Sequence, residues 1–332
     1  MKKSFKILIL LLSISLNSIA QKPSDFGFRH LQYVFEKDTI DVLIKSKKGE
    51  ELVKKPLFFE MQGSLATPLI IHNGKKRTSF ISIAEGFVED DYHLAIVNKP
   101  GVPLIVHRDS LVDGREYFKD KKNYIYTEEY LKNNNLEYYT KTNIRVLDSL
   151  VKLPFIDSSK IVVSGHSQGS TVAAAICSNS ALPTHLIYSS GLPYYSTILA
   201  ILHQQRMKEV NAQNPKVANT FKIWEEVVND TLNHFHPNRD SNKTLYSFSK
   251  SDNKTLMSLK IPVLISYGSK DESYPYNDMF HIETIKEKRT NFTFLDYFGL
   301  GHNYQRKVNN AEMKKDYLAD VVKDWLQWLK AN

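Results

Sequence analysis

Apolar and polar positions follow two different rhythms along this chain. Short apolar runs, typical of buried parallel strands, alternate with longer segments in which apolar residues recur every three or four positions, as in helices. A further pair of segments alternates with a period of two, which predicts an antiparallel hairpin. The hairpin is expected over 26–36 and 39–45, and the buried strands over 56–61, 92–97, 160–164, 185–191, 262–267 and 291–297.

Helical spacing lies between most of these strands. It predicts helices over 136–153, 170–176, 196–210, 217–228 and 313–329, and a short helix around 81–88. Strands that alternate with helices favour an α/β fold, with a mostly parallel central sheet and helices on both faces. Residues 103–126 are expected to form a long loop.

Residues 192–259 interrupt the alternation of strands and helices. A plain crossover needs far fewer residues, so we expect a helical cap inserted over the carboxyl edge of the sheet. Phe221, Trp224 and Val228 are expected to share a buried face of this cap, close to Ser167.

The stretch Gly165-His166-Ser167-Gln168-Gly169 lies between a predicted strand and a predicted helix. It matches G-x-S-x-G, a sharp turn in which the serine backbone is strained and nearby side chains would collide. A serine hydroxyl becomes a useful nucleophile when a base takes its proton and a third group orients that base. The pattern and its context therefore indicate Ser167 as a nucleophile.

Two later strand ends carry residues that could complete such a site. Asp271 and Glu272 follow one predicted strand, and His302 follows the last one. Because the carboxyl ends of parallel strands meet at one edge of a sheet, we expect these residues near Ser167. The alternative for each alone is ordinary: Asp271 would cap a helix beginning near Ser273, and His302 would be a loop residue.

The order Ser, Asp, His at these strand ends resembles the α/β-hydrolase family, over nearly all of residues 21–332. The resemblance implies an α/β-hydrolase fold with Ser167 as nucleophile and His302 as general base, then acid. It implies Asp271 as the carboxylate that orients the histidine, with Glu272 as the alternative.

The same resemblance implies an oxyanion hole made of two N–H donors. One is expected from Gln168, directly after the nucleophile, and the other from the loop Gln62-Gly63-Ser64. Ser64 is favoured as the second donor, and Gly63 is the alternative. The Gly-rich run of lipase-type esterases is absent at this place in the sequence.

Other candidate residues carry weaker signals. His234 and His236 alternate as metal ligands can, but without an acidic or Cys partner they are better explained as surface residues. Glu225 and Glu226 resemble the glutamate pair with which some serine aminopeptidases and dipeptidyl peptidases hold a substrate amino terminus. A solvated helix face is the simpler interpretation of that pair. Tyr194 and Tyr195 are candidates for the pocket mouth or for anchoring the cap.

The first twenty residues read as a cleaved signal peptide. Three lysines precede an apolar run over 7–16, and Ser18 and Ala20 give a small-residue cleavage site, so Gln21 would begin the mature chain. The run is too short to span a membrane comfortably, which disfavours an uncleaved anchor. The sequence thus predicts a secreted or periplasmic protein without stable membrane insertion.

Composition adds limits rather than a function. The 332 residues are 42% apolar and 24% charged, as in ordinary globular proteins. The net charge is +8, yet the basic residues are scattered and no nucleic-acid motif occurs, so no nucleic-acid partner is expected. Cys177 is the only cysteine, which excludes an intrachain disulfide and suggests a small buried side chain. Neither a cofactor nor a metal is implied.

These observations predict a serine hydrolase that cleaves an ester or related acyl bond through an acyl-enzyme. The expected partner is a small-molecule or peptide substrate. One alternative is a serine peptidase, aminopeptidase-like or dipeptidyl-peptidase-like, with the same triad. The other is a non-catalytic binding protein on the hydrolase fold, because a fold does not determine a function.

Overall fold

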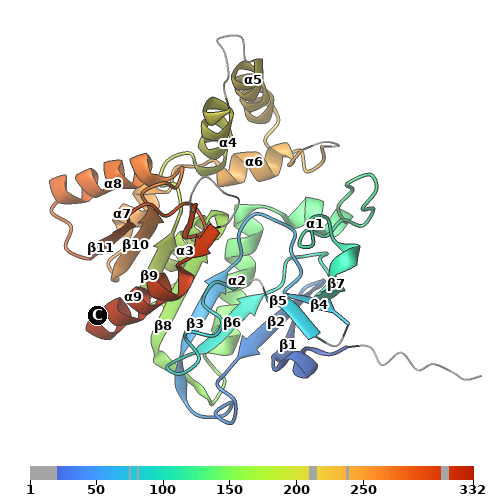
Figure 1. Ribbon diagram of the computed structural model, residues 1–332, viewed down its shortest axis with the longest axis vertical. Coiled ribbons are helices and arrows are strands. Elements are labelled where there is room, and N and C mark those ends of the chain that lie inside the picture. The colour runs from blue at the N-terminus through green and yellow to red at the C-terminus, as the bar shows by residue number, and fades with distance from the viewer. Residues whose placement is uncertain (1–20, 75, 81, 209–214, 237–238, 308–313) are drawn as a thin grey trace, which may run out of the picture.

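An eight-stranded sheet forms the centre of the computed structural model, which describes residues 21–332 except 75, 81, 209–214, 237–238 and 308–313 (Figure 1). The strand order is β1-β2-β6-β3-β8-β9-β10-β11. The pairs β1–β2 and β2–β6 are antiparallel, and all later neighbours are parallel, so the sheet is mostly parallel as predicted. The strands are β1 (Arg29–Phe35), β2 (Asp38–Lys45), β3 (Lys55–Met61), β6 (His93–Val97), β8 (Ile156–His166), β9 (His185–Ser189), β10 (Val263–Gly268) and β11 (Phe292–Tyr297).

Helices cover both faces of this sheet. Because side chains alternate along a strand, Leu57 and Phe59 of β3 pack into one layer, whereas Phe58 packs into the other. The helices that pack into the first layer are α2 (Leu136–Leu150), α3 (Gln168–Asn179), α7 (Asn253–Ser258) and α8 (Tyr274–Lys286). Helix α9 (Leu318–Ala331) covers the opposite face with Trp325 and its apolar neighbours. Burial of apolar surface on both faces is the main source of stability for the sheet.

The predicted helix over 313–329 begins later than expected. Residues 314–316 form the short strand β13 (Lys314–Asp316), which pairs with β12 (Gln305–Lys307), and α9 starts only at Leu318. Met313 lies outside the described residues, as does the end of the helix predicted over 196–210.

The short helix expected around 81–88 is wrong. The described part of this segment forms bends and turns. The Ser82 hydroxyl accepts the N–H groups of Ala84 and Glu85, and itself donates to the carboxylate of Glu60. These bonds would suit the start of a helix, but Gly86 has a φ of 87°, in the left-handed region, and its N–H donates to the Glu89 carboxylate, so the chain turns instead of continuing as a helix.

A second, three-stranded sheet with the order β5-β4-β7 was not predicted. Its strands are β4 (Ile70–Asn73), β5 (Lys76–Phe80) and β7 (Ile105–His107). β7 begins the segment that was expected to be a long loop, and the rest of 108–126 is mostly turns and bends, with a 3-10 turn over Arg108–Ser110. Strands of three to five residues are too short to show a clear period in the sequence.

Three helices of the interval 192–259 lie beyond the carboxyl end of the sheet in Figure 1, namely α4 (Ser196–Met207), α5 (Pro215–Asn229) and α6 (Asn242–Phe248). The rest of the interval returns to the core. The buried Asp252 accepts hydrogen bonds from the Thr171 hydroxyl at 2.7 Å and the Tyr188 hydroxyl at 3.0 Å. Helix α7 follows, and its Leu256 packs into the same core layer as α3 and the sheet.

The expected buried face of α5 is partly wrong. Phe221 and Val228 are 50% and 51% exposed, whereas Val217 and Val227 are buried. Apolar residues occur on two sides of this helix, and the sequence alone does not show which side meets α4 and α6.

Cys177 lies in α3 within the core, as predicted. Among the described residues, no helix is both long enough and apolar enough to cross a membrane.

Candidate active site

The parallel strands bring their carboxyl ends to one edge of the sheet. The register pairs Met61 with Gly165 and His166 with Ser189, so the ends of β3, β8 and β9 are level. Ser167 follows β8 directly and precedes the first residue of α3. The sequence-predicted nucleophile therefore lies at the edge where open α/β sheets bind ligands.

The backbone at Ser167 is strained, with φ 57° and ψ −128°. A Cβ at Gly165 would lie 2.0 Å from the Gly169 carbonyl oxygen, and a Cβ at Gly169 would lie 2.4 Å from the Met61 carbonyl oxygen. Only glycine fits either position. The Ser167 N–H donates to the Ser189 carbonyl at 2.9 Å, which holds the turn against the next strand. Such strain persists only where the surroundings impose it.

His302 and Asp271 come together at the ends of β11 and β10. The Nδ1 atom of His302 lies 3.0 Å from the Oδ1 atom of Asp271, whose side chain is fully buried. The loops that follow β10 and β11 approach each other closely. A Cβ at Gly268 would lie 2.1 Å from the Leu300 carbonyl oxygen, so only glycine allows this approach. Asp271 also accepts the Ser273 N–H at 3.1 Å, so it supports the start of α8 as well.

The pair has the electrostatics of an oriented base. Burial alone would raise the pKa of the Asp271 carboxyl, but the hydrogen bond and charge of His302 hold that pKa below its ordinary value. Burial likewise opposes protonation of His302, and Asp271 outweighs it, so the pKa of His302 is raised. Glu272 adds a smaller charge effect in the same direction. The carboxylate in contact with His302 is therefore that of Asp271.

Contacts from the residue after β9 and from the end of β8 tie His302 to the region of Ser167. The Ser190 hydroxyl donates to the His302 carbonyl at 3.1 Å, and the rings of His302 and His166 have centroids 5.0 Å apart. In the described part of the chain, no side-chain hydrogen bond involves the Ser167 hydroxyl. Catalytic hydrogen bonds are often long in unliganded sites and tighten when the substrate binds.

The loop after β3 passes the beginning of α3. A Cβ at Gly169 would lie 2.8 Å from the Gln62 carbonyl oxygen, so this loop and the helix are in backbone contact. Gln168 is the first residue of α3, where N–H groups have no partner within the helix. Gln168 and the loop at Gln62 and Gly63 thus lie beside the turn that carries Ser167, and a Cβ at Gly63 would lie 3.8 Å from the His166 carbonyl oxygen.

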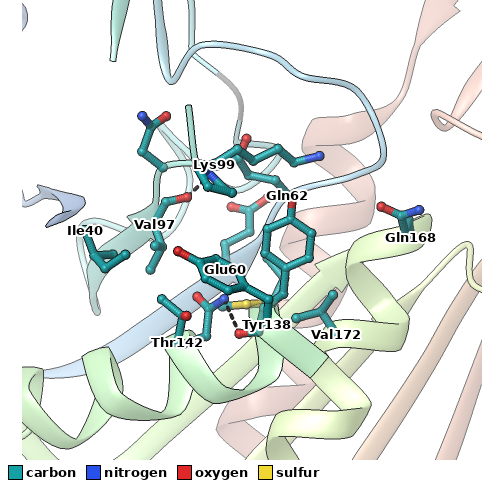
Figure 2. Close-up of a pocket in the computed structure, with 14 residues that line it drawn as sticks. Ile40, Glu60, Gln62, Val97, Lys99, Tyr138, Thr142, Gln168 and Val172 are labelled. Carbon is teal, nitrogen blue, oxygen red and sulfur yellow. Dashed lines mark hydrogen bonds between the residues drawn. The ribbon is translucent and has the colours of Figure 1, made fainter. Parts of the chain in front are cut away.

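A small cavity of about 30 Å³ adjoins this loop (Figure 2). Side chains of α2 and α3, and of the chain at and after the ends of β3 and β6, line it. The labelled residues in Figure 2 are Ile40, Glu60, Gln62, Val97, Lys99, Tyr138, Thr142, Gln168 and Val172.

Neither a protein-family model nor a curated protein sequence matches the chain. Solved structures do match its fold, at low sequence identity. Acylaminoacyl peptidase from Pyrococcus horikoshii is 13% identical with a TM-score of 0.54, and the match covers 91% of this chain and 40% of that one. Dipeptidyl peptidase 4 from Porphyromonas gingivalis is 14% identical with a TM-score of 0.55, and the match covers 92% and 35%.

Est1E from Butyrivibrio proteoclasticus is 14% identical with a TM-score of 0.51, and here the match covers 91% of this chain and 99% of that one. All three neighbours are α/β-hydrolases. The chain has the α/β-hydrolase fold. It spans less than half the length of the two peptidases and nearly the full length of Est1E.

Sequence reasoning missed a buried polar chain behind the site of this hydrolase fold. His166 Nδ1 lies 2.9 Å from the Ser189 hydroxyl, which lies 2.6 Å from the Tyr304 hydroxyl, and Tyr304 continues to the Ser266 hydroxyl at 2.8 Å. Burial and the charge of His302 lower the pKa of His166 to about 3. His166 is therefore neutral at ordinary pH and does not compete with His302 for the charge of Asp271. The only sequence signal was the polar residues inside otherwise apolar strands.

Lys99 was also missed. It follows β6, is 4% exposed, and binds the carbonyl oxygens of Gly63 at 2.6 Å and Ser64 at 2.9 Å. In the sequence it appears as an ordinary lysine in a Lys-Pro-Gly turn.

The weaker candidates lie elsewhere. Glu226 of α5 is exposed and lies 3.3 Å from the half-buried Arg239, an ion pair within the cap. No group of three or more potential metal ligands occurs among the described residues, and His234 is exposed. Tyr194 donates to Glu283 at 2.7 Å, and Tyr195 is 55% exposed.

Proposed function

We propose that the protein is a serine hydrolase that cleaves an ester or related acyl bond with Ser167, His302 and Asp271. The observation that carries this proposal is the strained Ser167 at a sheet edge where a buried Asp271 orients His302. Strained serine backbones and oriented imidazoles are costly arrangements, and they cluster at catalytic sites.

In the proposed reaction, Nε2 of His302 takes the hydroxyl proton of Ser167 while Oγ bonds to the substrate carbonyl carbon. The carbonyl oxygen becomes an oxyanion that accepts N–H bonds from Gln168 and Ser64. Collapse breaks the bond to the leaving alkoxide, which takes the proton from His302 and departs as an alcohol. Water then attacks the acyl-enzyme through the same base, releases the acid and returns the proton to Ser167.

The test is covalent labelling with a fluorophosphonate probe. Wild type should label and Ser167→Ala should not, because only a serine with an oriented base reacts at a useful rate. Equal labelling of both proteins would refute the assignment. A panel of acyl esters of different length then identifies the substrate class.

The second candidate function is peptide hydrolysis. It is favoured by the names of two structural neighbours, acylaminoacyl peptidase and dipeptidyl peptidase 4. The glutamate pair that suggested it is less persuasive, because Glu226 already pairs with Arg239. Aminoacyl amides compared with esters of matched acyl groups decide between the two. An amide with kcat/KM equal to that of its ester would favour the peptidase.

We also propose that the protein is exported and begins at Gln21 after cleavage. The charged start, the short apolar run and the small residues Ser18 and Ala20 support this. Those residues lie outside the described part of the chain. Intact mass of the exported protein gives the answer, and a mass that includes residues 1–20 would refute cleavage.

A further inference from the structure

Lys99 is a buried lysine bound to the loop that follows β3. Its Nζ donates to two successive carbonyl oxygens, those of Gly63 and Ser64. In the described part of the chain, no carboxylate forms an ion pair with it. Its other neighbours are the rings of Tyr130 and Tyr139, with centroids 5.9 and 5.8 Å from Nζ. A buried ammonium without an ion partner depends on these carbonyls and rings for stabilisation.

The electrostatic surroundings of Lys99 agree with this picture. Burial lowers the pKa of Lys99 to about 7, and the more distant charges of Asp240 and Glu116 oppose that effect. Asp240 stands just before α6, in the cap. Lys99 also lines the cavity that Gln168, the first residue of α3, borders (Figure 2).

Peptide planarity shows what the two hydrogen bonds do. In a trans peptide, the carbonyl of one residue and the N–H of the next point in opposite directions. Because Lys99 holds the Gly63 carbonyl, the Ser64 N–H points away from Lys99. The Gln62 carbonyl faces Gly169 of α3, so the Gly63 N–H points away from that helix. Of the two alternatives for the second oxyanion donor, the geometry therefore favours Ser64.

We propose that Lys99 is a positioning residue of the oxyanion hole, which holds the Gly63 carbonyl so that the Ser64 N–H is directed at the substrate oxygen. The inference rests on the proposed serine hydrolase activity. Tyr130 supports the same loop, because its hydroxyl donates to the Ser64 carbonyl at 3.2 Å. Lys99 itself touches neither the substrate nor the reacting atoms.

The main test is Lys99→Met, which keeps the length of the side chain and removes the ammonium. We expect kcat to fall about 10- to 100-fold, somewhat less than the loss of an oxyanion donor itself, with KM nearly unchanged. A trifluoromethyl ketone, which forms a tetrahedral oxyanion on the serine, should bind more weakly by the same factor as kcat/KM. A merely structural role would not produce this parallel loss.

Lys55 offers a control that is matched in its backbone contacts. It is a second buried lysine, 8% exposed, and its Nζ donates to the carbonyls of Glu89 at 3.0 Å and Asp90 at 2.8 Å. Unlike Lys99, it also forms an ion pair with Glu50 at 2.5 Å. It stands at the opposite end of β3 from the site. Lys55→Met should reduce stability but leave kcat per folded molecule unchanged. Equal kcat values for Lys99→Met and Lys55→Met would overturn the inference.

If Lys99→Met does not fold, Tyr130→Phe decides the question. It keeps the ring and removes the hydroxyl bond to the Ser64 carbonyl. We expect a two- to fivefold fall in kcat, a modest loss typical of one hydrogen bond that acts indirectly. An unchanged kcat would refute the role of this restraint. Failure of wild-type Ser167 to label would instead refute the proposed function, whereas a labelled wild type with a fully active Lys99→Met would refute only the role of Lys99.

Discussion

Glu60 should make the protein less stable as the pH rises, and Glu60→Gln should remove that loss. Glu60 lies in β3, is 3% exposed, and accepts the Ile83 N–H at 2.9 Å and the Ser82 hydroxyl. Burial raises its pKa from 4.5 to about 7, against the opposing effect of these hydrogen bonds. The folded protein therefore keeps a proton on Glu60 at pH values where the unfolded chain has lost it.

The sign and size follow from proton linkage. Because the folded pKa lies above the unfolded one, the free energy of unfolding falls as pH rises from about 4.5 to about 7. The two pKa values give Glu60 a loss of about 2.5 kcal/mol between about pH 5 and pH 8. A glutamine does not titrate, and its oxygen can accept the Ile83 N–H. The Ser82 hydroxyl loses its acceptor in this variant, which lowers stability by an amount that does not depend on pH.

Urea unfolding followed by tryptophan fluorescence measures this effect at both pH values. The difference in unfolding free energy between Glu60→Gln and wild type should grow in favour of the variant by about 2.5 kcal/mol from about pH 5 to pH 8. A difference that stays constant across this range would refute the reasoning. Asp252→Asn provides a second case, because burial also raises the pKa of Asp252 to about 7 and the same sign is expected.

Three further predictions concern activity. Asp271→Asn should lower kcat by about 10³–10⁴-fold. Because Asp271 raises the pKa of His302, the acid limb of the pH profile of kcat/KM should also move to lower pH in this variant. An acid limb that does not move would contradict the proposed pairing of Asp271 with His302. Gly169→Ala places a Cβ 2.4 Å from the Met61 carbonyl oxygen. The clash should displace the start of α3 and the expected Gln168 donor, so kcat should fall about 100-fold in a folded protein. Unchanged steady-state rates would contradict this prediction. Trp224→Ala in the cap should reorder an ester panel by kcat/KM while probe labelling persists, and a uniform fall for every ester would make the cap a scaffold.

The nucleophile turn could be predicted because its constraints are local. The glycines that flank Ser167 are required by atoms within a few residues or by the adjacent strand, and the sequence pattern records them directly. The strands that carry the site could be predicted for a similar reason. A parallel strand buried on both faces is a mostly apolar run, so residues 160–164 and 262–267 can be recognised without any knowledge of their partner strands.

Features that depend on which side of an element is covered could not be predicted. Apolar residues occur on two sides of α5, so Phe221 and Val228 were assigned to the wrong face. The segment around 81–88 has a helical spacing, but Gly86 takes a φ of 87° and donates its N–H to the Glu89 carboxylate, so no helix continues through it. A pattern of apolar residues does not show which conformation a glycine adopts.

The sequence by itself determined the α/β alternation, the strained serine turn and the order in which acid and histidine follow it. Tertiary structure decided that Asp271 rather than Glu272 contacts His302, and that Lys99 holds the loop beside Ser167. The physical reason is the range of the interactions. Periodicity and steric conflicts act between residues close in the chain, whereas a buried charge is stabilised by groups that only the folded chain brings within hydrogen-bond distance.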